Sequence, residues 1–190
     1  RSMTRIPRTD IDAFPLVLGG NTFGWTSDRE QSFAVLDEFV AAGGNVIDSA
    51  DLYSEWVDGH CGGESERMIG EWVAARQNRS EVVITTKVGG LSTRKGLSPE
   101  NVELALHESL GRLRTNYIDI YYAHFDDPGV PIDIQVRTAR SLVDSGRVRY
   151  IGLSNHGPER TREFIRVAQA DGGPLPVALQ PHYNLIHREE

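Results

Sequence analysis

The chain has 190 residues, 39% of them hydrophobic, and a net charge of −7 at pH 7, which predicts a single domain over residues 1–190 with a substantial core. Because the charge is negative and the basic residues are scattered, the composition argues against nucleic acid or an anionic membrane surface as the main partner. No apolar run approaches the roughly 20 residues that span a bilayer, and the one cysteine, Cys61, cannot form an internal disulfide, so we expect a cytoplasmic protein without a signal peptide.

Short apolar runs and stretches of helical periodicity alternate along the chain. The apolar runs predict strands over residues 15–20, 46–48, 81–87, 117–124, 148–152 and 177–180. Apolar residues at helical spacing predict helices over about residues 28–42, 68–73, 99–113, 132–144 and 159–170. Ser27 or Asp28 can cap the first helix, and Ser98 with Pro99 begins the third. Long irregular loops are expected over residues 53–63 and 88–96.

This alternation, with no hairpin signal between the strands, predicts a parallel sheet with helical crossovers. Five of the strands end at or just before a polar residue, namely Asp48, Lys87, His124, Ser154 and Gln180. One polar side chain per unit at the carboxyl end is typical of a (β/α) barrel, whose chemistry gathers on that face. A doubly wound sheet would favour a glycine-rich phosphate turn after the first strand, and Gly19-Gly20 lacks the required spacing. The predicted fold class is therefore α/β, of the TIM-barrel type.

Four side chains of the chain are predicted to converge on this face. Asp48 ends a buried strand, where a carboxylate is costly unless a cation meets it, and Lys87 ends the next strand. Tyr53 follows in the loop after Asp48, and His124 ends a third strand. Taken singly, each has a structural interpretation, such as a buried ion pair, a surface aromatic residue or a histidine at a strand end. Their shared placement favours a catalytic group.

Several stretches resemble the aldo-keto reductases, in the order in which that family carries them. They are residues 44–50 (GNVIDSA) with Tyr53, 86–89 (TKVG), His124 with 127–128 (DP), 146–155 (GRVRYIGLSN) and 180–185 (QPHYNL). The match runs from about residue 16 to the end of the sequence. The resemblance implies a (β/α)8 TIM barrel that binds NADPH, with NADH possible, and reduces a small aldehyde or ketone.

The resemblance also implies roles for individual residues. Tyr53 would be the general acid, and Asp48, Lys87 and His124 would complete a catalytic tetrad. The nicotinamide would be held by Ser154, Asn155 and Gln180, with Asp48 and Thr22 beside the cofactor. Trp25 and Trp56 lie on loops at the same face, where with His124 they would contact the substrate. As alternatives, Ser154 and Asn155 can cap a helix, Gln180 can satisfy backbone groups at the rim, and the tryptophans can pack within their loops.

One departure from the family concerns the number of βα units, because the family has eight and this chain supplies about six. The two absent strands normally provide an aromatic residue that stacks on the nicotinamide and basic residues that bind the adenosine phosphate. A complete barrel needs about 250 residues, and an open one leaves unpaired edges. We therefore expect the sequence to be part of a longer protein.

The chemistry of carbonyl reduction explains these residue types. Negative charge builds on the carbonyl oxygen, so the site must give that oxygen a proton. A free tyrosine, with a pKa near 10, is a reluctant acid, and a lysine cation within about 4–6 Å stabilises the tyrosinate. Asp48 would keep Lys87 charged, and a neutral His124 would orient the carbonyl oxygen. No metal is expected, because His60 and Cys61 lack a second ligand pair.

Three other functions remain open at this stage. Lys87 could attack a carbonyl directly, as in a Schiff-base lyase. The chain could instead be a non-catalytic regulatory subunit that binds NADPH, or an inactive partial barrel that binds no dinucleotide.

Overall fold

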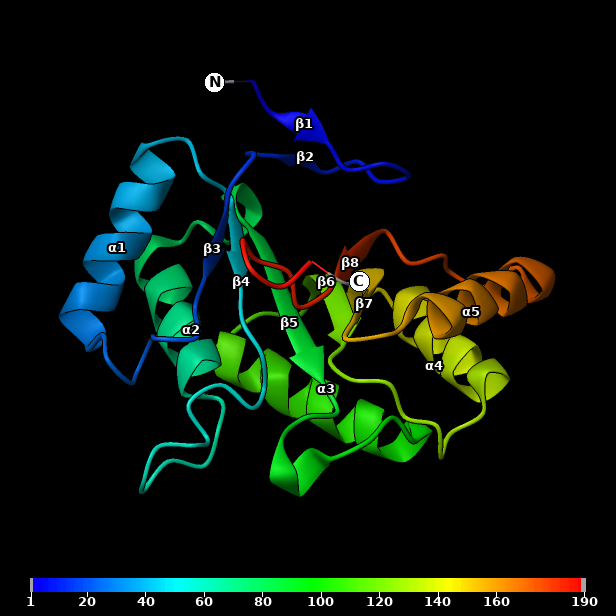
Figure 1. Ribbon diagram of the computed structural model, residues 1–190. Helices are drawn as coiled ribbons and strands as arrows, with labels where there is room; N and C mark the ends of the chain where they lie inside the picture. The colour runs from blue at the N-terminus through cyan, green and yellow to red at the C-terminus, as the bar shows by residue number, and fades with distance from the viewer. Residues whose placement is uncertain (1, 189–190) are drawn as a thin grey trace.

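The fold is a curled half-barrel of parallel strands with helices on its outer face, as a computed structural model shows for residues 2–188 (Figure 1). The six strands lie in chain order in the sheet, and they are β3 (Val17–Gly19), β4 (Val46–Asp48), β5 (Val83–Val88), β6 (Ile118–Ala123), β7 (Val148–Ser154) and β8 (Ala178–Gln180). Every neighbouring pair is parallel. The predicted α/β class is confirmed, with six of the strands that a (β/α)8 barrel requires.

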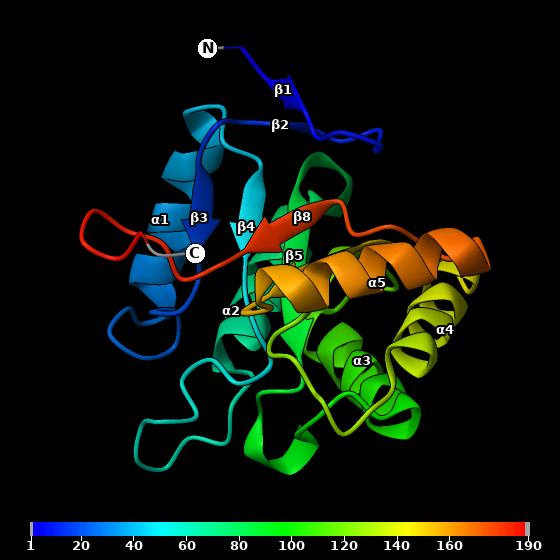
Figure 2. The ribbon, with the colours of Figure 1, turned by 45° about the vertical axis from the view of Figure 1, so that its right-hand side comes forward.

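Five helices connect these strands and cover the outside of the sheet. They are α1 (Arg29–Ala41), α2 (Glu64–Arg76), α3 (Pro99–Leu113), α4 (Ile132–Asp144) and α5 (Pro158–Asp171). In both ribbon views α1 and α2 lie on one side, α4 and α5 on the other, and α3 between them (Figures 1 and 2). The predicted caps are confirmed, because Asp28 accepts a hydrogen bond from the Gln31 backbone and Ser98 accepts one from Asn101.

Two layers of apolar side chains flank the sheet. Helix-facing residues of the strands join the larger core cluster, which contains Trp72 at 1% exposure. The alternate residues of the strands face the barrel interior. Val46, Val83, Ile120 and Tyr122 form a smaller cluster there, together with Ile11 from the N-terminal segment. Successive side chains of a strand point to opposite faces, so every second residue shares a face. Asp48, Lys87 and His124 follow the interior-facing Val46, Val83 and Tyr122 by two, four and two positions. All three side chains therefore face the interior.

An N-terminal hairpin precedes the barrel strands and was not predicted. Its strands, β1 (Thr4–Arg5) and β2 (Asp12–Ala13), pair antiparallel and lie at the amino-terminal ends of the barrel strands (Figure 1). Arg8 turns the chain at φ 63° and donates a hydrogen bond to the Pro176 carbonyl at 3.0 Å. Because Ile11 packs with the interior cluster, the hairpin covers this mouth and leaves the carboxyl-terminal mouth to the predicted site.

The boundaries of several elements differ by a few residues from the sequence expectation, and those of β5 and β7 have clear structural reasons. Residues Arg79–Glu81 form a short 3-10 helix, η1, and β5 therefore begins later than expected. The β7 strand continues to Ser154, because Ser154 pairs with Gln180 of β8. A second short 3-10 helix, η2 (Ser92–Arg94), lies in the loop after β5.

The two edge strands of the half-barrel present apolar side chains to solvent. Val17 of β3 is 51% exposed and Leu179 of β8 is 58% exposed. In a complete eight-stranded barrel such edges are paired with further strands. Within residues 2–188, no helix combines the length and apolar composition needed to cross a membrane.

A buried carboxylate on β6 joins three neighbouring elements. The Asp119 side chain is 2% exposed and accepts hydrogen bonds from the guanidinium groups of Arg79 at 2.8 Å and Arg149 at 2.6 Å. It also accepts one from the Ile84 backbone of β5 at 2.9 Å. These partners offset the cost of burying the charge.

Removing this carboxylate should strongly destabilise the fold. Asp119→Ala leaves the partly buried Arg79 without its counter-ion and Arg149 with Asp10 alone, so we expect the free energy of unfolding in urea to fall by about 3–5 kcal/mol. The matched control Asp133→Ala breaks an exposed pair with Arg137 and should cost less than about 1 kcal/mol. Equal losses in the two variants would contradict the structural role of Asp119.

Candidate active site

The ammonium group of Lys87 is the centre of a buried polar cluster at the carboxyl ends of β4 and β5. Its Nζ donates hydrogen bonds to Asp48 Oδ2 at 2.7 Å, to the Ser49 carbonyl at 2.8 Å and to the Tyr53 hydroxyl at 2.9 Å. The side chain is 1% exposed. Since an ammonium has three N–H donors, all three are used, and the cation is fully satisfied.

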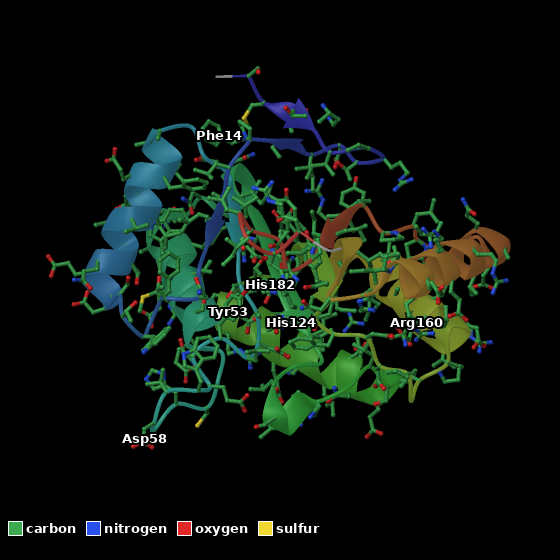
Figure 3. The ribbon with its side chains drawn as sticks, viewed as in Figure 1. Phe14, Tyr53, Asp58, His124, Arg160 and His182 are labelled. Atoms are coloured by element: carbon green, nitrogen blue, oxygen red, sulfur yellow. The ribbon has the colours of Figure 1, made fainter. Side chains whose placement is uncertain are left out.

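The Tyr53 hydroxyl accepts one of these hydrogen bonds, and this fixes what its own proton can do. A phenol that accepts from Lys87 keeps its O–H free to donate in another direction. The Tyr53 ring meets the His124 ring edge-on, with centroids 6.2 Å apart (Figure 3). A carbonyl oxygen near both rings could therefore receive a proton from Tyr53.

Asp48 is held by three donors from two strands, β5 and β8. Its Oδ2 accepts from Lys87 and from Gln180 Nε2 at 3.1 Å, and its Oδ1 accepts from Thr85 Oγ1 at 2.5 Å. Thr85 precedes Lys87 by two residues and so shares its face of β5. Charge-assisted hydrogen bonds of this kind stabilise the ionised carboxylate. The Asp48 carboxylate thereby balances the buried lysine cation.

His124 is positioned as a neutral imidazole. Its side chain stacks on Phe125, with ring centroids 4.5 Å apart and an interplanar angle of 8°. Burial, and then the nearby Lys87 cation, lower the pKa of His124 to about 4, while Asp48 opposes the shift. The ring is therefore neutral at pH 7 and has one N–H donor and one acceptor. Its buried Nδ1 has no hydrogen-bond partner within residues 2–188.

Two exposed tryptophans from separate loops meet beside Tyr53. Trp25, after β3, is 45% exposed, and Trp56, after β4, is 50% exposed. Their rings pack edge-to-face with centroids 5.4 Å apart, and Trp56 lies 6.3 Å from the Tyr53 ring. Together with Phe125, which is 44% exposed, they form an aromatic surface next to the buried cluster. Both tryptophans thus lie at the predicted face.

The ends of β7 and β8 bring three further polar residues to the same mouth. Ser154 Oγ donates to the Gln180 carbonyl at 2.9 Å, and Asn155 Nδ2 donates to the His124 carbonyl at 2.9 Å. The side-chain amide oxygens of Asn155 and Gln180, unlike the Gln180 backbone carbonyl, accept no hydrogen bond from any other described residue. Two free amide acceptors beside a hydroxyl fit the hydrogen-bonding needs of a carboxamide. These residues can therefore accommodate the nicotinamide end of a cofactor.

Not every predicted residue joins the cluster. Thr22 lies in the loop after β3, where its carbonyl accepts from the Trp25 and Ser27 backbones, and in the described part of the chain its side chain makes no hydrogen bond to the tetrad. No cluster of three or more potential metal-binding side chains occurs among residues 2–188.

Sequence reasoning missed several polar residues around the site. Asp51 has a fully buried carboxyl group, and burial, reinforced by Glu66, raises its pKa to about 8. Thr86 donates to Glu66 at 2.6 Å on the helix-facing side of β5, next to Lys87. The strand period of two predicts that Thr85 shares the face of Lys87. The Glu66 contact was not, because it depends on how α2 packs.

Comparison with known proteins places this geometry in context. A family model described as the aldo/keto reductase family matches residues 15–190. The protein tas of Escherichia coli (strain K12) is 31% identical over 97% of this chain and 60% of its own length. The NADP(+) aryl-alcohol dehydrogenase of Phanerodontia chrysosporium is 36% identical over 96% of this chain and 51% of its own.

A further relative is norsolorinic acid reductase B of Aspergillus parasiticus, which is 36% identical over 96% of this chain and 50% of its own length. The chain thus spans about half the length of the curated relatives that it matches. The family model covers nearly the whole chain and includes every strand of the half-barrel. The chain belongs to the aldo/keto reductase family.

Proposed function

We propose that this chain carries the catalytic face of an NADPH-dependent reductase that converts an aldehyde or ketone to an alcohol. The observation that carries the proposal is the 2.9 Å hydrogen bond from Lys87 Nζ to the Tyr53 hydroxyl, with Asp48 on the other side of the same ammonium. The bound nicotinamide would supply the hydride. NADPH is preferred over NADH because one similar protein is named for NADP(+).

Tyr53 is the proposed general acid. Its hydroxyl accepts from Lys87 and is free to donate its proton to the carbonyl oxygen as negative charge develops there. The tyrosinate that remains lies against the ammonium, which stabilises it electrostatically. Asp48 keeps that ammonium charged in its buried position. The proton transfer thus depends on Tyr53, Lys87 and Asp48 acting as one unit.

His124 is the proposed orienting group. As a neutral ring it can donate one N–H to the carbonyl oxygen without placing a second cation beside Lys87. Asn155, which donates to the His124 backbone, ties this residue to the proposed nicotinamide site. Ser154, Asn155 and Gln180 would hold the carboxamide.

The substrate is proposed to be an aromatic carbonyl compound. The exposed surface formed by Trp25, Trp56 and Phe125 borders the Tyr53 ring and suits a planar apolar group. Two similar proteins are named for an aryl alcohol and for norsolorinic acid. This support is independent of the catalytic cluster.

The geometry also bears on the alternative functions. Lys87 uses all three of its N–H donors, so attack on a carbonyl would first require it to lose a proton and its contact with Asp48, which disfavours a Schiff-base lyase. Borohydride trapping with substrate tests this directly, because the chain has only one other lysine, Lys95. A non-catalytic regulatory subunit would bind NADPH tightly but show negligible turnover across a panel of aldehydes.

Removal of the Tyr53 hydroxyl tests the general acid. Tyr53→Phe should lower kcat by at least about 100-fold, because no other group replaces the proton donor. The dissociation constant for NADPH should be nearly unchanged. Oxidation of NADPH with an aromatic aldehyde, followed by absorbance, gives kcat, and calorimetric titration gives the dissociation constant. The control Tyr150→Phe removes a hydroxyl that bonds Asp10 at the opposite mouth and should keep its activity; preserved turnover in Tyr53→Phe would refute the assignment.

Removal of the Lys87 cation tests the electrostatic argument. Lys87→Met should abolish turnover and also lower stability, because Asp48 is left buried without its counter-ion. The double variant Asp48→Asn/Lys87→Met removes both charges and should recover stability but not turnover, which separates catalysis from folding. Lys95→Met, at an exposed position, serves as the control. Turnover restored with stability would show that the pair is only structural.

The pKa of His124 predicts a pH dependence of stability. Between pH 6.5 and about 4 the unfolded chain binds a proton at this residue that the folded chain does not, so stability falls as pH falls through this window. The loss attributable to His124 approaches about 3 kcal/mol at the acidic end. Urea unfolding of the protein and of His124→Asn at several pH values measures the difference. Parallel pH profiles would show that the histidine is not held neutral.

A further inference from the structure

His156, in the loop between β7 and α5, has a buried ring although its neighbours on both sides are exposed. Its side chain is 1% exposed, whereas Asn155 and Gly157 are exposed residues. Nδ1 lies 2.7 Å from the carbonyl oxygen of Ser154. A carbonyl oxygen only accepts hydrogen bonds, so Nδ1 must carry the proton, and Nε2 of the neutral ring is an acceptor.

The surroundings of Nε2 disfavour a second proton on the ring. Nε2 is buried and has no hydrogen-bond partner within residues 2–188. The nearest carboxylate, Asp126 in the loop after β6, is 3.9 Å away and is already held by Arg160 through bonds of 2.8 and 2.9 Å. Arg160 also pairs with Glu163. Burial lowers the pKa of His156, with Arg160 adding to the shift and the Ser154 carbonyl and Asp126 opposing it.

The hydrogen bond from His156 fixes one end of a peptide group whose other end is also held. The carbonyl of Ser154 and the N–H of Asn155 belong to the same planar peptide unit. His156 holds the carbonyl, and the N–H donates to the Gln180 carbonyl at 3.4 Å. With both ends held, Asn155 adopts a left-handed conformation at φ 52°, and its side chain reaches the His124 carbonyl and Ser154 Oγ.

We propose that His156 is a positioning residue that holds the 154–155 peptide so that Ser154 and Asn155 face the nicotinamide carboxamide. This inference rests on the proposed function, because it needs the cofactor role of Ser154 and Asn155. His156 itself touches neither substrate nor cofactor.

Two variants of His156 separate the hydrogen bond from the shape of the ring. His156→Phe keeps a planar ring but removes the donor, whereas His156→Asn keeps an N–H near the position of Nδ1 and cannot titrate. In the full-length protein at pH 7.5, calorimetric titration should show that His156→Phe binds NADP+ about fivefold more weakly, the effect of one lost hydrogen bond. His156→Asn should bind NADP+ nearly as tightly as the unaltered protein.

A ligand without nicotinamide distinguishes positioning from general damage. Adenosine 2′,5′-bisphosphate, which lacks the nicotinamide, should bind equally well to all three proteins. If His156→Phe lost affinity equally for both ligands, or lost no affinity for NADP+, the positioning role would be overturned.

Failure of the proposed function would look different from failure of this inference. If the unaltered protein bound no NADP+, the proposed function and the inference would both fall. Nitrogen-15 NMR of the histidine rings gives a readout that needs no cofactor. It should show His156 protonated at Nδ1 and neutral at pH 7, and the opposite tautomer would overturn the inference alone.

Discussion

The interaction on which the site depends is the burial of one ammonium group among three acceptors. A lysine cation this far from water is costly, and it is tolerated here because the Asp48 carboxylate, the Ser49 carbonyl and the Tyr53 hydroxyl each accept one hydrogen bond from it. Asp48 ends β4, Ser49 directly follows it, and Tyr53 lies in the loop after it, whereas Lys87 belongs to β5. The parallel pairing of these two strands, with Asp48 opposite Thr85, therefore brings the acceptors to Lys87 and offsets the cost of burying its charge.

Much of this arrangement could be read from the sequence, and the reason is the geometry of strands. In parallel strands the side chains alternate between faces, and the carboxyl ends meet at one edge, so Asp48, Lys87 and His124 had to share a face once the strands were located. Tyr53 lies in a loop and does not follow this alternation. Its inclusion rested on its place five residues after Asp48, and its role as general acid came from the family resemblance; the structure brings it within hydrogen-bonding distance of Lys87. The roles assigned to these residues remain proposals.

Other features were beyond the reach of sequence patterns. The N-terminal hairpin has strands of two residues each, which are too short for a periodic signal, and its turn depends on the left-handed Arg8. The Asp119 cluster joins residues that are 30 and 40 positions away in the chain. His156 resembled an ordinary loop residue until the packing of α5 and the loop after β6 enclosed its ring. In each case long-range packing, rather than local preference, decides the contact.

One carboxylate also links the two halves of the proposed chemistry across 132 positions of the chain, because Asp48 binds both Lys87 and the side chain of Gln180. Under the proposed roles, the group that supports the proton donor is also the group that orients a nicotinamide ligand. A substitution at Gln180 that changed dinucleotide recognition would then also disturb the acidity of Tyr53. Adaptation to new carbonyl compounds would instead change the exposed Trp25 and Trp56, whose side chains make no hydrogen bond to the buried cluster in the described part of the chain.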